Sequence, residues 1–417
     1  MNVRRNASVL AAATAVIGAA TAPAVAAGPS PSAKPALPSG LHGSTDPTYD
    51  GVWRQSLALL AQHTVGVRPA ASAVHWLTGQ QCANGAFAPF RADVSKACDA
   101  GLMVDTNNTA AAVQALTALG GHRAVTGKAV AWLRSVQNTD GGWGYTPGGA
   151  SDTNSTSVVV GALTAVGEKP AQVEKGGRSP YDALVKLALP CKSEDASAGA
   201  FAFQPDKKGT LAANADATAA GVVGALGKGL AVEPAKHDEA AACSDSGSLA
   251  PRQAAANGAA YLTKVLTKDG HLMSALPGAT AQPDYGNTAD AVVALAAQGG
   301  AERAAGPLKW LERNASAWAK RSGPAAYAQL VFAAHATGTD PRDFGGTDLV
   351  KQLNATGPAP QSATAQSGGS GESAESAESA KDDDSDSGYI WWTVGAGLAA
   401  GAGVGFLISG WNKRKRP

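Results

Sequence analysis

The chain has 417 residues, a formal net charge of +1 and only 16% charged residues. Its basic residues form no stripe outside the extreme C-terminus, so a nucleic-acid partner is not expected. The sequence contains no Cys-x-x-Cys or His-x-x-x-His spacing, and we therefore expect neither a metal site nor a cofactor.

The N-terminus has the pattern of a secretory signal peptide. Arg4 and Arg5 precede an apolar run over 9–20, and a small-x-small cleavage site follows at 24–26. Such a segment is removed on export, so we expect residues 1–27 to be cleaved; the general and the twin-arginine routes both stay open. Residues 28–49, rich in Pro and Ser, are predicted to be a linker.

A degenerate repeat fills residues 50–355. Its clearest copy, Lys128 to Trp143, has a Trp-Leu pair, a Gln four residues later and a Gly-Gly-Trp turn, and an Asp then starts an Ala-rich helix. In the three best copies a Leu lies eleven residues after that Asp (116−105, 163−152 and 295−284). A repeat of this size indicates an array of stacked helical units.

The repeat predicts helices of two alternating kinds, one through the aromatic-Leu pair and one after the Asp. The helix through the pair, for example 126–137, is expected to pair with the helix that starts after the Asp motif, 154–166. The expected ranges are 52–64, 70–81, 108–119, 126–137, 154–166, 181–189, 216–228, 253–267, 288–298, 304–319, 325–337 and 346–354. Helix pairs of this kind must stack to bury their apolar faces, and a closed stack has no exposed ends. We therefore predict an all-α, (α/α)6 toroid, provided that the first and last helices pair with each other.

Most residues of the repeat have an expected structural role. Gln137 can bond to loop backbone, Trp143 can pack on the next repeat, and Gly141 with Gly142 permits a tight turn. The motif aspartates and the Asn, Ser and Thr residues that follow them are expected helix caps, at positions 105, 108, 109, 152, 155, 156, 284, 287 and 288.

All four cysteines fall in the repeat domain, and export favours their oxidation. Three connectivities are open to four cysteines. We favour Cys82–Cys98 and Cys191–Cys243, because each pair brackets one excursion between helices.

The C-terminus carries a second membrane signal. Residues 356–388 form an acidic Ser/Gly/Glu stalk that is expected to be disordered. The next 23 residues, 389–411, carry no charge, have Trp near both ends and precede a basic tail at 412–417, which predicts a transmembrane helix with a cytoplasmic C-terminus. We therefore expect a single-pass cell-membrane protein with its repeat domain outside. Gly397, Gly401 and Gly405 lie on one face of the span and suggest a homodimer through this helix.

The stretch Lys128–Trp143 resembles the prenyltransferase/squalene oxidase repeat of squalene and oxidosqualene cyclases and of protein prenyltransferase β-subunits. The Asp105-Thr and Asp152-Thr helix starts are similar to those of the cobalamin carriers intrinsic factor and transcobalamin. The resemblance covers about 50–355 and implies an (α/α)6 toroid with a central cavity. It implies no single activity, because one fold serves many functions.

The catalytic motifs of these families are missing. An Asp-x-Asp-Asp acid motif is absent from 50–355, as are the prenyltransferase zinc site and the Gly-Cys-Gly-Glu-Gln thioester of complement-type domains. Asp105 with Asp152 could form the carboxylate pair of a glycosidase, but their context is that of helix caps. We therefore expect no catalytic residue, and the alternatives are a cyclase-like or carbohydrate-active enzyme and a structural surface module.

The preferred interpretation is a membrane-anchored extracellular toroid that binds a ligand. It would capture a small molecule, corrinoid-like by analogy with the carriers, for uptake, with a transporter or a clamp protein as partner. The inner helices would be 108–119, 154–166, 216–228, 288–298 and 325–337, and their N-terminal turns would rim the cavity and suit a polar or anionic group. The predicted rim residues are Asp105, Asn107, Tyr145, Asp152, Asn154, Asp216, Tyr285 and Asn287, with Tyr327 deeper.

Overall fold

The computed structural model describes residues 38–192, 196–235, 242–245, 248–274, 281–299 and 301–362. The predicted signal peptide, nearly all of the stalk, the transmembrane span at 389–411 and the basic tail lie outside these residues, and only 38–49 of the linker lies within them. Within the described ranges, no helix is both long and apolar enough to cross a membrane.

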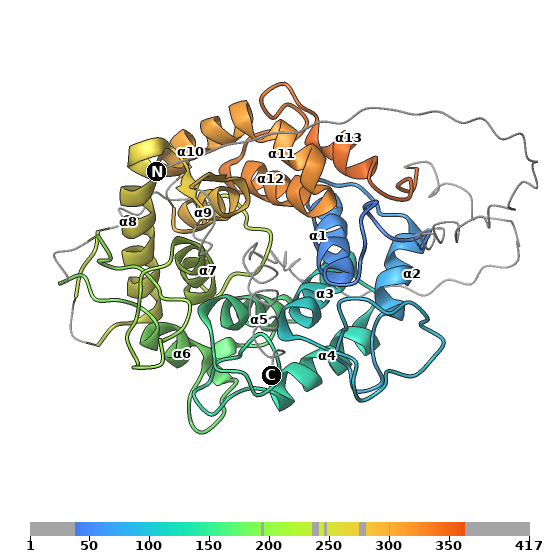
Figure 1. The fold of residues 1–417 in the computed structure, drawn as a ribbon, viewed down its shortest axis with the longest axis horizontal. Coiled ribbons are helices and arrows are strands. Elements are labelled where there is room, and N and C mark those ends of the chain that lie inside the picture. Colours follow the sequence, from blue (N-terminus) through green and yellow to red (C-terminus); the bar gives the residue numbers. More distant parts are fainter. Residues whose placement is uncertain are drawn as a thin grey trace, which may run out of the picture. The chain divides into compact units, whose positions relative to one another are not determined.

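Six of the described helices form a closed inner ring (Figure 1). Each packs against the next one along the chain, and the last packs against the first. The structure adds 51–64 to the five predicted inner helices. The ring consists of α1 (Gly51–Thr64), α3 (Thr106–Leu119), α5 (Thr153–Ala165), α7 (Ala215–Ala225), α9 (Tyr285–Ala297) and α12 (Pro324–Thr337).

The other helices lie outside this ring. In contrast to the expected pairing, most outer helices pack mainly on the inner helix that precedes them. The exception is α11, which packs on α12, the inner helix that follows it, and α13 contacts both α12 and α1 and so joins the two ends of the ring. The outer helices are α2 (Ala71–Gly79), α4 (Arg123–Ser135), α6 (Pro180–Lys186), α8 (Pro251–Asp269), α10 (Ala301–Asn314), α11 (Ser316–Ser322) and α13 (Leu349–Asn354).

Two local features depart from the prediction. The helix expected over 304–319 is interrupted between α10 and α11, where the Asn314 side chain donates to the Trp310 carbonyl at 2.7 Å and competes with the helical ladder. The mostly helical domain also contains a 3₁₀ turn, η1 (Pro170–Gln172), and an antiparallel hairpin of β1 (Leu272–Met273) and β2 (Pro283–Asp284). Strands of two residues leave too short a pattern to predict.

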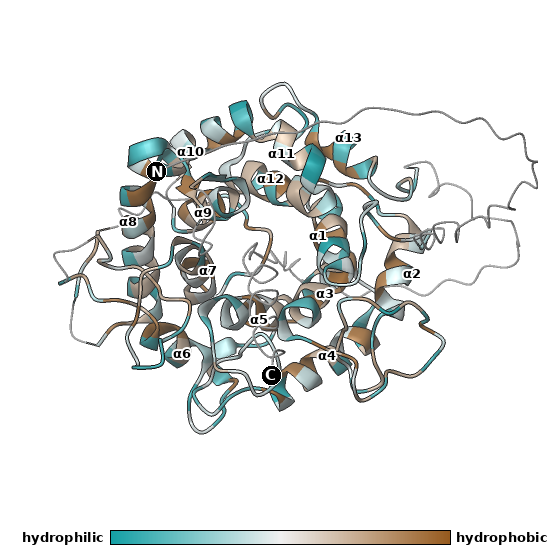
Figure 2. Cartoon of the chain, viewed as in Figure 1, coloured by the Kyte–Doolittle hydropathy of each residue, from teal (hydrophilic) through white to brown (hydrophobic). Residues whose placement is uncertain are grey.

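The inner helices are buried almost all round, whereas outer helices such as α10 expose hydrophilic residues (Figure 2). Small side chains allow this close packing. A Cβ on Gly161 of α5 would collide with the backbone of Gly229, and one on Gly224 of α7 would collide with Ser157. The Ala- and Gly-rich composition therefore lets neighbouring inner helices approach closely.

The repeat residues join successive repeats as predicted. Gln137 donates to the carbonyls of Gly141 at 2.8 Å and Val173 at 3.1 Å, and Gln81 repeats this pair of bonds one unit earlier. Trp143 is fully buried, and its indole N–H donates to the Leu133 carbonyl at 2.7 Å. The tight turn depends on Gly141 alone, with a φ of +88°, while Gly142 is needed because a Cβ there would meet Ser151 and Ala183.

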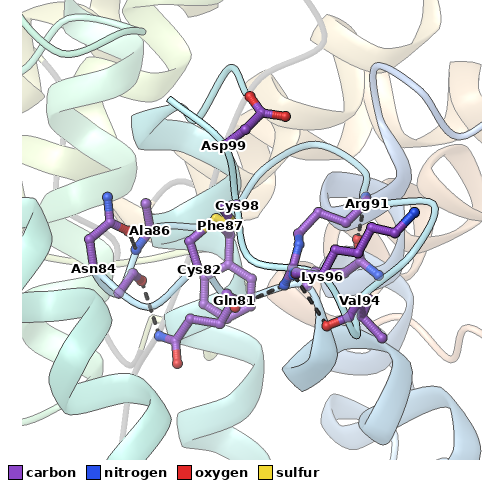
Figure 3. Close-up of a disulfide and its surroundings, with 12 residues drawn as sticks. Gln81, Cys82, Asn84, Ala86, Phe87, Arg91, Val94, Lys96, Cys98 and Asp99 are labelled. Atoms are coloured by element: carbon purple, nitrogen blue, oxygen red, sulfur yellow. Dashed lines mark hydrogen bonds between the residues drawn. A yellow bond between two sulfur atoms is a disulfide. The ribbon is translucent and has the colours of Figure 1, made fainter. Parts of the chain in front are cut away.

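Both predicted disulfides are present, Cys82–Cys98 and Cys191–Cys243. They close loops of 16 and 52 residues, which corresponds to about 3 and about 4 kcal/mol of chain-entropy stabilisation. Arg91 organises the first loop, where its guanidinium donates to the backbone carbonyls of Gly79, Gln81, Val94 and Lys96 (Figure 3).

The two ends of the described domain meet at the seam between α12 and α1. The Gly43 N–H donates to the Thr356 carbonyl at 2.7 Å, and Gln62 donates to Asn354 at 2.8 Å. Gln361 then binds the backbone just before α2, at the carbonyls of Arg68 (2.9 Å) and Pro69 (2.7 Å). These bonds fasten the last described residues to the first.

Candidate functional site

The motif aspartates cap the inner helices. Asp105, Asp152 and Asp284 accept hydrogen bonds from the backbone N–H three residues on, at 2.7, 2.6 and 3.0 Å. In the third repeat the cap of α7 is Asn214, which accepts a bond of 2.9 Å from the Ala217 N–H. Asp216 therefore lies two residues after the cap, inside the helix.

The second residue of three inner helices is polar. It is Asn107 in α3, Asn154 in α5 and Asp216 in α7, and all three are buried. Asn154 donates to the Asp216 carboxyl at 2.9 Å. The amide oxygens of Asn107 and Asn154 are buried without a hydrogen-bond partner. The ring therefore holds polar atoms that its own side chains leave unsatisfied.

A second buried carboxyl lies on α9. Asp290 is 4% exposed, and both of its oxygens accept from the same Gln329 amide of α12, at 3.3 and 3.2 Å. Asn287 donates to Asp284 at 2.9 Å, and its amide oxygen is also unpaired. We call these three hydrogen-bonded pairs, whose carboxyls act on one another by charge, the acid–amide cluster: Asn154, Asp216, Asp284, Asn287, Asp290 and Gln329.

Burial raises the pKa of two carboxyls of the cluster. It raises the pKa of Asp216 to about 6, and the carboxyls of Asp284 and Asp152 add to the rise. It also raises the pKa of Asp290 well above the ordinary value, with Asp216 and Asp284 again adding to the rise. The cluster therefore contains two acids that readily lose a proton once a compensating positive charge arrives.

The predicted rim residues at the starts of α3 and α5 are mostly occupied with structural bonds. The Tyr145 hydroxyl hydrogen-bonds to the Asp105 carboxyl, and the Tyr145 backbone approaches Asp152. Burial raises the pKa of both aspartates to about 6, although hydrogen bonds oppose the shift. Tyr145 thus ties two helix caps together, and its hydroxyl already has a partner.

The remaining two tyrosines are in different surroundings. Tyr285 is half-buried and stacks between Trp310 and Trp318, with ring centroids 5.0 and 5.5 Å apart. His271 stacks on Trp310 at 4.3 Å, which extends this aromatic stack to four rings. Tyr327 is 5% exposed and belongs to the apolar core. The structure therefore pairs Asn154 with Asp216 and Asn287 with Asp284, whose charge acts on Asp216, while Tyr285 belongs to the aromatic stack and Tyr327 to the core.

Sequence reasoning missed Asp290, Gln329, Trp310 and Trp318. A signal for Asp290 was present, because it is the one acidic residue inside the otherwise apolar stretch that follows the cap in 288–297. A hollow of about 840 Å³ between α3, α4 and α5, lined by Gly120, Arg123, Arg134 and Glu168 among others, contains none of the predicted rim residues. The described residues include no group of three His, Cys, Asp or Glu that could hold a metal.

No family model matches the chain, and no curated protein matches its sequence. Among solved structures, ent-copalyl diphosphate synthase from Streptomyces platensis is 17% identical, covers 69% of this chain and 50% of its own, and has a TM-score of 0.46. A protein from Actinoplanes is 13% identical, covers 72% of this chain and 94% of its own, and also scores 0.46. The chain spans about half the length of the synthase. A terpene cyclase is thus among the neighbours, but the likeness is too distant to bear on activity, and the likeness to cobalamin carriers stays a prediction.

Proposed function

We propose that this domain binds a small molecule at the acid–amide cluster and performs no chemistry on it. The observation that carries the proposal is that the amide oxygens of Asn154 and Asn287, both in the cluster, are buried and have no hydrogen-bond partner. Buried polar atoms are nearly always paired, so a site with several unpaired acceptors is suited to a ligand that supplies the missing donors. The predicted role is capture for uptake, with a transporter or clamp protein as partner.

Native mass spectrometry of the full chain, purified from its own host, tests this proposal. We expect a bound species of defined mass in the wild-type protein. Asn154→Leu should lose it while keeping the wild-type circular dichroism spectrum, whereas Gln204→Leu, on an exposed loop, should retain it. A bare polypeptide mass, or a ligand unaffected by Asn154→Leu, would contradict the proposal.

The corrinoid candidate can be tested separately. Cyanocobalamin added to the same protein should co-elute in gel filtration and be detected by its visible absorbance. Failure to co-elute would remove the corrinoid and leave other ligands open, because the carrier resemblance alone suggests it.

A second candidate function is supported by Asp290. This carboxyl is buried, its pKa is raised well above the ordinary value, and Asp216 and Asp284 help to keep it protonated. Those are properties of a general acid, even without the Asp-x-Asp-Asp motif. Incubation with squalene, followed by gas chromatography and mass spectrometry, tests it: a cyclic product that disappears in Asp290→Asn would favour an enzyme.

A further inference from the structure

We propose that the ligand presents a protonated amine to the acid–amide cluster. This inference rests on the proposed binding function and specifies the chemical class of the ligand. It follows from the hydrogen-bonding groups that the cluster leaves free, the charges around it and the aromatic rings beside it.

The free groups of the cluster are acceptors. The amide nitrogens of Asn154, Asn287 and Gln329 each donate to a carboxyl, that of Asp216, Asp284 and Asp290, respectively. The amide oxygens of Asn154 and Asn287 are unpaired, and the two oxygens of Asp290 share one donor at more than 3 Å. A ligand group that fits must therefore donate hydrogen bonds, and an ammonium donates three and accepts none.

The charges around the cluster favour a cation. In the described part of the chain, the charged groups that act on Asp216 and Asp290 are all carboxyls: Asp152 and Asp284 besides the two themselves. The charged forms of Asp216 and Asp290 are therefore destabilised, and a bound cation would offset that cost. A divalent metal fits less well, since three metal-ligating side chains do not gather anywhere in these described ranges.

An anionic group, as expected from the helix N-termini, fits poorly. The first turns of α3, α5, α7 and α9 already give an N–H to their own capping side chains. A phosphate or carboxylate at this place would also lie beside Asp216 and Asp284. The caps thus reverse the preference that bare helix ends would have for negative charge.

The aromatic stack gives the amine an apolar neighbour. A Cβ on Gly286 would lie 3.4 Å from the Gln329 amide and 3.6 Å from the Trp318 ring, which places the indole beside the partner of Asp290. Trp318 is half-buried and stacks on Tyr285. An indole next to carboxyls suits an alkylammonium, because the ring attracts the charge and packs against the carbon skeleton.

Three probes of equal size distinguish the classes: cyclohexylamine, cyclohexanol and cyclohexanecarboxylate. Their affinities for the full chain at pH 7.5 can be measured by saturation-transfer NMR. We expect the ammonium to bind at least tenfold more tightly than the alcohol, and the carboxylate not to bind. Asp290→Asn should lose this preference and keep the wild-type circular dichroism spectrum, whereas Asp206→Asn, at an exposed loop, should retain it. If Asp290→Asn does not fold, Trp318→Leu serves in its place and should weaken the ammonium at least tenfold.

Proton release provides an independent measurement. Because burial raises the pKa of Asp216 to about 6 and that of Asp290 well above its ordinary value, ammonium binding at pH 6 should release protons, and its affinity should rise as the pH is raised through about 6. Calorimetry in two buffers with different ionisation heats measures the released protons. Alcohol or carboxylate binding as tight as that of the ammonium, no binding of any probe, or ammonium binding without proton release at pH 6 overturns the ammonium class. The binding function itself is judged by the native mass measurement.

Discussion

A buried aspartate acts as a cap or as an unsatisfied acid depending on the donors around it. Asp152 receives the Ser155 N–H at 2.6 Å and the Ser155 hydroxyl at 2.8 Å, and it fixes the start of α5. Asp290 sits in the second turn of α9, where the backbone N–H groups are already used by the helix, and it receives only long bonds from Gln329. The first carboxyl therefore stabilises its helix, and the second is available to an incoming group.

The capping role can be measured with Asp152→Ala. We expect this change to lower the free energy of unfolding by about 1–2 kcal/mol, because the Ser155 N–H loses its acceptor. Asp343→Ala is the control, since that aspartate is exposed and caps no helix; its effect should stay within about 0.5 kcal/mol. Urea unfolding followed by circular dichroism gives both values, and equal effects would argue against the cap.

The candidate site was partly predictable at this scale. Asp105, Asp152 and Asp284 follow from a fixed spacing, since a cap is a local feature. The contact between Asn154 and Asp216 joins residues 62 apart, and that between Asp290 and Gln329 joins residues 39 apart. Neither leaves a periodic trace, so the cluster could be found only once the helices were placed in space.

At the scale of the element, one glycine per turn sets how closely successive outer helices pack. Gly85, Gly141 and Gly199 all have positive φ, and a Cβ on each would collide with the backbone at Lys128, Ser179 and Asn257, respectively. Each of these backbone positions lies in the next outer helix or at its N-cap. The Gly-x-aromatic motif is therefore a packing device between repeats as well as a turn.

Gly141→Ala and Gly148→Ala separate these two effects. Both glycines have positive φ, +88° and +76°, but a Cβ on Gly148 meets nothing within 4 Å. We expect Gly148→Ala to cost about 1–2 kcal/mol from backbone conformation alone. Gly141→Ala should cost clearly more, or prevent folding, since it also collides with Ser179. Thermal melts of both variants suffice, and equal losses would show that the turn conformation alone requires glycine.

The helix order was predictable because the repeat carries its own period, and its end residues are caps, glycines and prolines. The pairing of outer with inner helices was predicted wrongly, because loop length does not reveal on which neighbour an outer helix packs. The break between α10 and α11 depends on one asparagine side chain. A feature that depends on a single side-chain contact cannot be predicted from a hydrophobic pattern.

At the scale of the molecule, the ring concentrates buried carboxyls, and stability should depend on pH. Burial raises the pKa of Asp105, Asp152 and Asp216 to about 6. The unfolded chain loses these protons near pH 4, so between pH 4 and 6 the folded state binds more protons, and stability falls as the pH rises. Burial lowers the pKa of His42 to about 4, and its contribution has the opposite sign, being lost as the pH falls below about 6.5.

Asp216→Asn isolates the carboxyl contribution. An asparagine does not titrate, so the stability lost between pH 4 and 7 should shrink in this variant, by up to about 3 kcal/mol. Chemical denaturation at a series of pH values measures the slope. The histidine contribution cancels between wild type and variant, and parallel curves would mean that Asp216 has an ordinary pKa in the folded protein.

The closed ring also makes a prediction about connectivity. Its ends meet at the seam, where Gly43 bonds to Thr356 and Gln361 bonds to the backbone before α2. A Cβ on Gly40 would touch Ser72 of α2, so residues 40 and 361 reach the same region. Because each inner helix has a neighbour on both sides, no break in the chain between helices removes a helix contact.

A circular permutant tests this. Residue 361 is joined to residue 38 by about six Gly/Ser residues, and the chain is opened between Lys207 and Lys208, in an exposed turn. Permutation succeeds at such sites when the termini lie close together. We expect a cooperative melt within a few degrees of the same residues in natural order. A permutant opened inside α5, between Val159 and Val160, should not fold, because both residues are fully buried in a ring helix. If the first permutant melts far below the protein with the natural residue order, the seam bonds depend on free chain ends. The stability of the ring then depends on how its helices are connected as well as on the contacts between them.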